Sequence, residues 1–184
     1  MLRFKTAIEK KIQASAVLAR LEGGRIERLR LLKLLYIADR ESLKERACPI
    51  IGGRVVAMNN GPLHSTVYNM IKGETEEPNH DWENVFKNDG HNVVLEQEPG
   101  RMELSDWEIE KLTAVSESHR SIDTWELAEL THGFREWQEC HFEGSSRTIP
   151  LEKILTVLGF TADEIDEIQK EAEAHARMER LIGS

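Results

Sequence analysis

The chain has 184 residues, and its 40% hydrophobic and 31% charged content is typical of a globular domain and excludes a disordered chain. No apolar run approaches the roughly 20 residues that a membrane span needs, and the first residues do not resemble a signal peptide, so we expect a cytoplasmic protein without a membrane partner. The net charge of −9 divides into +6 over residues 1–50 (12 Lys or Arg, 6 Asp or Glu) and −15 over residues 51–184 (12 Lys or Arg, 27 Asp or Glu), and a chain that is acidic as a whole is repelled by nucleic acid.

A first helix is predicted over residues 4–21. Its apolar residues recur at helical spacing and form one face. Gly23 and Gly24 should end it, because glycine readily adopts the left-handed conformation that closes a helix.

A second helix is predicted over residues 25–46. Its middle, residues 31–38, is apolar nearly all round, so we expect a central helix packed on several sides. The basic residues around its start give a faint helix-turn-helix appearance, but the helix is too apolar in its middle to lie in a DNA groove. We interpret this basic run as a solvated surface that pairs with acidic groups or docks an acidic partner; it comprises Arg20, Arg25, Arg28, Arg30 and Lys33.

Short extended segments and turns follow. Residues 50–58 are β-branched and interrupted by glycine, which favours a strand or hairpin, and Asn-Asn-Gly-Pro at 59–62 is a turn. A short helix is predicted over residues 65–72, with Gly73 as its stop. Residues 74–84 are expected to form an acidic loop, and the Asp-Gly pair at 89–90 predicts a second hairpin.

The C-terminal half is predicted to be helical. Ser105 with Glu108, and Thr161 with Glu164, have the spacing of capping boxes. The expected helices cover residues 105–118, 124–131, 151–158 and 161–182, and residues 133–144 are expected to be irregular and aromatic-rich. The predicted fold class is therefore mainly α (α+β), a compact helical domain with one or two small β-hairpins inserted between helices. We expect one domain over residues 1–184, with a helical extension over about 150–184.

No constellation of catalytic or metal-binding residues stands out. The seven histidines form no HExxH motif and no set with Cys-x-x-Cys, and there is no GxSxG elbow and no phosphate-binding loop. Cys48 and Cys140 do not make a disulfide framework. We expect no enzyme activity, no catalytic residue, no metal and no cofactor.

Three stretches of sequence carry a resemblance to a known family. KLLYIADRESL at 33–43 is followed by PIIGGRVVAMNNGPL at 49–63, and LAELTH at 127–132 is followed by Trp137. In this order they resemble the Panacea domain of SocA-like, phage-associated antitoxins. The resemblance covers roughly residues 30–140, with the motif-bearing core at about 25–140.

The resemblance implies an antitoxin that neutralises a cognate toxin, usually encoded beside it, by direct binding. In a SocA-like member the antitoxin instead acts as an adaptor that delivers its toxin to a protease, and a DNA-binding regulator is a weaker alternative. The toxin's identity and the oligomeric state stay open. The candidate partner-binding residues are Arg40, Asn59, Asn60, Gly61, Pro62, His64, Tyr68, His132 and Trp137.

A purely structural role for the motif residues remains open as well. Asp39 could cap or pair locally, Tyr36 could belong to the core, and Gly61-Pro62 could be only a tight connection. For each of these we favour the structural role over partner contact.

Overall fold

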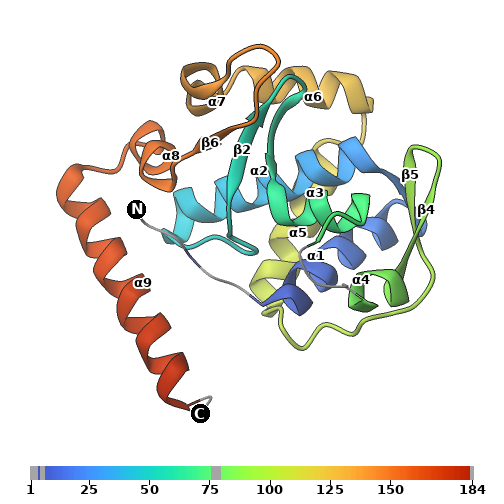
Figure 1. Ribbon diagram of the computed structural model, residues 1–184, viewed down its shortest axis with the longest axis horizontal. Helices are drawn as coiled ribbons and strands as arrows, with labels where there is room; N and C mark the ends of the chain where they lie inside the picture. The colour runs from blue at the N-terminus through green and yellow to red at the C-terminus, as the bar shows by residue number, and fades with distance from the viewer. Residues whose placement is uncertain (1–3, 5–6, 76–79, 183–184) are drawn as a thin grey trace.

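The structure is a computed structural model that describes residues 4, 7–75 and 80–182 (Figure 1). Its elements confirm the prediction of a mainly helical α+β fold with small hairpins between helices. In chain order they are α1 (Ile8–Leu21), β1 (Arg25–Glu27), α2 (Arg28–Arg46), β2 (Val55–Met58), β3 (Gly61–His64), α3 (Ser65–Lys72), α4 (His80–Val85), β4 (Phe86–Asp89), β5 (Asn92–Leu95), α5 (Asp106–Ser118), α6 (Thr124–His132), α7 (Arg135–Cys140), β6 (Arg147–Ile149), α8 (Leu151–Leu158) and α9 (Ala162–Ile182).

Helix α2 is the centre of the molecule, as its apolar middle predicts. Every residue from Arg30 to Asp39 is buried. The helix packs against α1, α5 and α6, and also against α3, α8 and strands β1 and β3 (Figure 1). The polar side chains of residues 30–39 are therefore held inside the protein, where each one must find a hydrogen-bond partner.

Helix α1 is more deeply buried than predicted. It begins at Ile8 and not at Phe4, and all residues from Lys11 to Ala19 are buried. The prediction of a single apolar face was wrong because α1 is enclosed by α2, α5, α4 and β5, and its small residues allow close packing on every side. Gly23 and Gly24 end it with φ of 82° and 86°, as predicted.

Each predicted hairpin gains a third strand that the sequence did not indicate. β4 and β5 pair with β1 in the order β1-β5-β4, and β2 and β3 pair with β6 in the order β3-β2-β6, all antiparallel. Residues 25–27 were predicted to be helical. They form a strand because the two preceding glycines redirect the chain and the exposed-buried-exposed pattern places Ile26 in the core.

The turn at residues 59–62 is shorter than predicted. Met58 pairs with Gly61, so only Asn59 and Asn60 form the turn, whereas Gly61 and Pro62 belong to β3 and are buried. Pro62 is tolerated in β3 because that strand lies at the edge of its sheet.

Two short helices lie in stretches predicted to be irregular. α4 begins at His80 within the predicted loop 74–84, of which residues 76–79 lie outside the described residues, and α7 occupies positions 135–140. Both have six residues, too few for an apolar period to show. The capping boxes at Ser105 and Thr161 are present as predicted.

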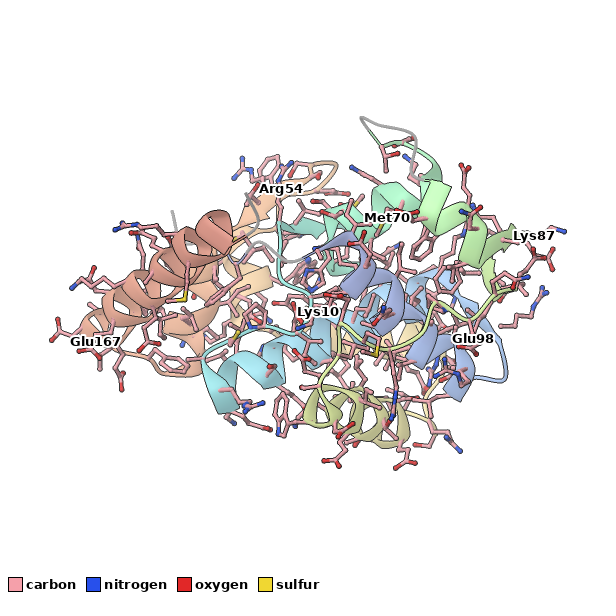
Figure 2. All side chains as sticks on the ribbon, turned by 90° about the horizontal axis from the view of Figure 1, so that it is seen from below. Lys10, Arg54, Met70, Lys87, Glu98 and Glu167 are labelled. Atoms are coloured by element: carbon pink, nitrogen blue, oxygen red, sulfur yellow. The ribbon has the colours of Figure 1, made fainter. Side chains whose placement is uncertain are left out.

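Helix α9 lies at one end of the molecule, with Glu167 far from Lys87 of β4 at the other end (Figure 2). It packs mainly on α8, through Ile165, Ile168 and Ala172. Among the described residues, none of the helices has the length and apolar character required to cross a membrane.

Candidate functional site

Asp39 of α2 holds the segment that follows this helix. Its Oδ1 accepts hydrogen bonds of 2.8 Å from the backbone N–H groups of Ile50 and Ile51, and its Oδ2 accepts one of 2.9 Å from Gly52. The side chain is buried, and a buried carboxylate requires this kind of compensation. Asp39 therefore fixes the connection from α2 towards β2, which is the local role that the sequence left open.

His64 at the end of β3 lies beside Asp39. Its Nε2 is 3.3 Å from Asp39 Oδ2, yet neither ring nitrogen makes a hydrogen bond within the described residues. Burial lowers the pKa of His64, and the Asp39 carboxylate opposes that change only partly, so the imidazole is neutral at pH 7. The adjoining cavity of about 20 Å³, lined by Asp39, His64 and Arg40 beneath Phe4, has room for about one water molecule.

Lys33 of α2 is fully buried against β3. Its Nζ donates a 2.8 Å hydrogen bond to the carbonyl oxygen of Pro62, and burial lowers its pKa from 10.5 to about 7. Gly61 has φ of 95°, and a Cβ at this position would lie 2.3 Å from Thr131 Oγ1 and 3.0 Å from Lys33 Nζ. Glycine is thus required here both by the backbone conformation and by the close approach of α2 and α6.

Tyr36 and Arg40, one turn apart on α2, share a carboxylate on α7. The Tyr36 hydroxyl donates to Glu136 Oε1 over 2.8 Å, and Arg40 Nε donates to the same atom over 2.6 Å. Glu136 is fully buried, and the Arg40 guanidinium lies 4.2 Å from the centre of the Phe134 ring. Burial first, and then the neighbouring Glu136, raise the pKa of Tyr36 well above its ordinary value, so the hydroxyl remains a donor.

Trp137 of α7 stands at the centre of an aromatic stack beside the β2–β3 turn. Its ring stacks on His132 at 4.2 Å and on His141 at 4.4 Å between centroids, and its Nε1 donates to the carbonyl oxygen of Met58 over 2.9 Å. His141 Nε2 lies 3.2 Å from Asn59 Oδ1. The stack therefore ties the exposed turn to α6 and α7.

Four of the nine predicted site residues meet at this place. Asn59 and Asn60 are exposed in the turn, and His132 and Trp137 are half-buried beside it. We call these four residues, together with His141, the turn surface.

The other five predicted site residues lie elsewhere. Gly61, Pro62 and His64 are buried in β3. Arg40 is occupied by Glu136, and Tyr68 is half-buried on α3 beside Lys72. Contact with a partner stays a prediction for all nine.

The sequence reasoning missed Glu136 and His141. Neither residue belongs to a motif with a recognisable spacing, and their partners lie 100 and 82 positions away, at Tyr36 and Asn59. The aromatic richness of residues 133–144 was the only sign that this segment packs on the motif residues.

The basic run at the start of α2 is only in part the solvated, acid-paired surface that was expected. Arg30 is buried, and its guanidinium donates to Glu22 and to the carbonyl oxygens of Ile122 and His119. Lys33 is fully buried as described above. Arg20 and Arg25 are exposed and pair with Glu98 and Asp89, as predicted, and Arg28 is half-buried.

Both cysteines are free thiols. In the part of the chain that the structure describes, no three His, Cys, Asp or Glu side chains are grouped as metal ligands.

Comparison with models of known protein families gives a match. A family model described as "Antitoxin SocA-like, Panacea domain" matches residues 31–138. These residues run from the buried part of α2 to Gln138 of α7, and so include Asp39, Lys33, Glu136 and Trp137. Neither the curated proteins nor the solved structures contain a significant match.

Proposed function

The chain belongs to the family of SocA-like antitoxins with a Panacea domain, and from this we propose that it neutralises a cognate toxin. Neutralisation occurs by direct protein–protein binding in the cytoplasm. The proposal needs no catalytic step, no metal and no cofactor. Its partner is a toxin protein, which we expect to be encoded by the adjacent gene.

The observation that supports direct binding is that the buried polar residues hold the fold together, whereas an exposed polar turn remains available to a partner. Polar residues of the first motif are used for contacts within the protein. Lys33 donates to the Pro62 carbonyl oxygen of β3, and Tyr36 and Arg40 donate to Glu136 of α7. The exposed Asn59-Asn60 turn is held by Asn59 Oδ1, which accepts from Gly144 N and lies 3.2 Å from His141 Nε2. The Asn59 NH₂ group and the Asn60 side-chain amide can bond a partner. A rigid polar surface loses little entropy when a partner binds, which favours tight association.

Co-expression with the protein encoded by the adjacent gene tests the proposal. We expect the chain to restore growth that the partner arrests, and to co-purify with it as a stable complex. Loss of growth in both the presence and the absence of the chain, together with no complex, would overturn the proposal.

A second function, delivery of the toxin to a protease, is supported by α9. This helix leaves the body of the molecule (Figure 1), and its exposed carboxylates could serve as a handle for a protease. The acidic residues of its first part are Asp163, Glu164, Asp166, Glu167, Glu171 and Glu173.

Toxin half-life separates the two functions. An inhibitor leaves the half-life of the toxin unchanged or lengthens it, whereas an adaptor shortens it, and a chain ending at Phe160 would abolish that shortening. Equal half-lives with the full chain and with the truncated chain would exclude the adaptor function of α9.

A further inference from the structure

The outward side of α6 exposes apolar side chains next to carboxylates. Trp125 is 64% exposed and Leu130 is 41% exposed, and Glu126 and Glu129 are exposed with them. Residues four positions apart are neighbours on a helix, so Trp125 adjoins Glu129 and Glu126 adjoins Leu130. We call these four residues the α6 face.

The opposite side of α6 anchors it to the core. Leu127, Ala128 and Thr131 are buried, and the capping box of Asp123 with Glu126 fixes the first turn. The α6 face is thus held on a rigid element, which is the condition for a preorganised binding surface.

The surroundings of the α6 face are acidic. Over residues 123–144 the only Lys or Arg is Arg135, which pairs with Glu139. The acidic residues of this stretch are Asp123, Glu126, Glu129, Glu136, Glu139 and Glu143. Among the described residues, no Lys or Arg pairs with Glu126 or Glu129, and Glu129 is 77% exposed with only His132 nearby, at 3.5 Å.

An exposed indole beside two carboxylates that pair with no Lys or Arg among the described residues is complementary to a cation. A guanidinium or ammonium group can lie over the face of Trp125 while it pairs with Glu129 one turn away. Tryptophan is also among the residues that contribute most to protein–protein binding when they become buried. A neutral or acidic partner would leave both carboxylates without compensation in the interface.

We propose that the α6 face docks an arginine- or lysine-bearing segment of the toxin. The inference rests on the proposed function, since it names the surface and the partner chemistry through which neutralisation occurs.

The test measures binding of the adjacent-gene product to purified variants of the full chain at several salt concentrations. Trp125→Ala and the double variant Glu126→Lys/Glu129→Lys should each weaken binding at least about tenfold, and the double variant should mainly slow association. The matched controls are Met102→Ala, which removes a side chain that is 92% exposed, and Glu110→Lys/Glu117→Lys, which reverses two exposed charges on α5. Both controls should bind within twofold of the wild type.

Unfolding temperatures of all variants show whether the fold is intact. The double variant should unfold at a slightly lower temperature, because Glu126→Lys removes the capping-box bond that Glu126 Oε2 accepts from Asp123 N, and the other variants should be nearly unchanged. If the wild-type chain does not bind, the proposed function fails and this inference fails with it. If the wild type binds and the α6 variants bind equally well, only the inference is overturned. A dimer of the chain alone that depends on Trp125, detected by light scattering, would also overturn it, because a second copy would then occupy the α6 face.

Discussion

Lys33, Tyr36 and Asp39 lie on successive turns of α2, and each of them bonds a different segment of the chain. Lys33 bonds β3, Tyr36 bonds Glu136 of α7, and Asp39 bonds the residues that follow α2. An unpaired polar group in the interior costs about 1–3 kcal/mol, so each of these contacts matters first for the fold. Substitutions at these positions should therefore reduce stability, and reduce partner binding only as a consequence.

Gly61 gives the sharpest stability prediction at a single residue. In Gly61→Ala the new Cβ would clash with Thr131 and Lys33 at a position with positive φ, and these effects together should cost about 3 kcal/mol of unfolding free energy. Gly144→Ala is the matched control, because its φ is 72° but its surroundings are open, and it should cost only about 1 kcal/mol. Urea unfolding of both variants measures the two losses of unfolding free energy. Equal losses would contradict the close approach of Lys33 on α2 and Thr131 on α6 to Gly61.

Lys33 makes stability depend on pH. Its pKa is about 7 in the folded chain and 10.5 as the ordinary value, so between these limits the unfolded chain binds more protons. Stability should therefore rise with pH from about 7 to 9.5, by at most ~1.4 kcal/mol per pH unit from this residue. Lys11, whose burial lowers its pKa to about 8, acts in the same direction above pH 8.

Lys33→Met keeps the length of the side chain but cannot titrate. Compared with the wild type, this variant should show a flatter dependence of unfolding free energy on pH between 7 and 9.5. Lys44→Met, at an exposed position near the end of α2, should leave the slope unchanged. An unchanged slope in Lys33→Met would mean that the amine stays protonated in the folded chain at these pH values.

At the level of elements, the sequence predicts those helices and hairpins that local residue patterns determine. The central burial of α2, both hairpins and the capped helices α5, α6 and α9 follow from apolar spacing, turn residues and capping boxes. Strands β1 and β6 could not be found in this way, because three residues carry no period and their strand state depends on distant partners. Glu136 could not be identified from the sequence for the same reason. Its role depends on a contact with Tyr36, which is 100 positions away in the chain.

Asp39 stabilises the loop that connects α2 with β2. In Asp39→Asn, one of the oxygens that accept the N–H groups of residues 50–52 is replaced by an NH₂ group that cannot accept them. We expect a loss of about 2–3 kcal/mol in unfolding free energy, and faster hydrogen exchange at residues 50–52 than elsewhere.

Asp166→Asn is the control for this change. Asp166 is exposed and pairs with Lys170 at 2.7 Å on the same helix, so loss of this surface ion pair should cost less than about 0.5 kcal/mol. If the two variants were equally stable, the carboxylate of Asp39 would not be holding the connection.

At the scale of the whole molecule, the fold neutralises the charge asymmetry of the sequence. The first 50 residues carry a net charge of +6, but three cations of their described part, Lys11, Arg30 and Lys33, are buried and do not contribute to a basic surface. Most of the remaining cations described there are paired with carboxylates of the acidic part of the chain: Lys10 with Glu108, Arg20 with Glu98, Arg25 with Asp89, and Arg40 with Glu136. The net charge of residues 1–50 therefore overestimates how strongly the folded chain attracts an anion.

This pairing predicts that the folded chain does not bind DNA. Affinity for DNA comes largely from cations that neutralise phosphates, and it falls steeply as salt increases. Titration of a fluorescent duplex at 50 mM salt should give no binding with the wild type. The double variant Asp89→Lys/Glu98→Lys frees Arg20 and Arg25 and adds two lysines beside them, so it should gain weak binding that disappears at 200 mM salt. Salt-dependent binding by the wild type itself would contradict the neutralisation and would favour a DNA-binding regulator, since only unpaired surface cations could produce it.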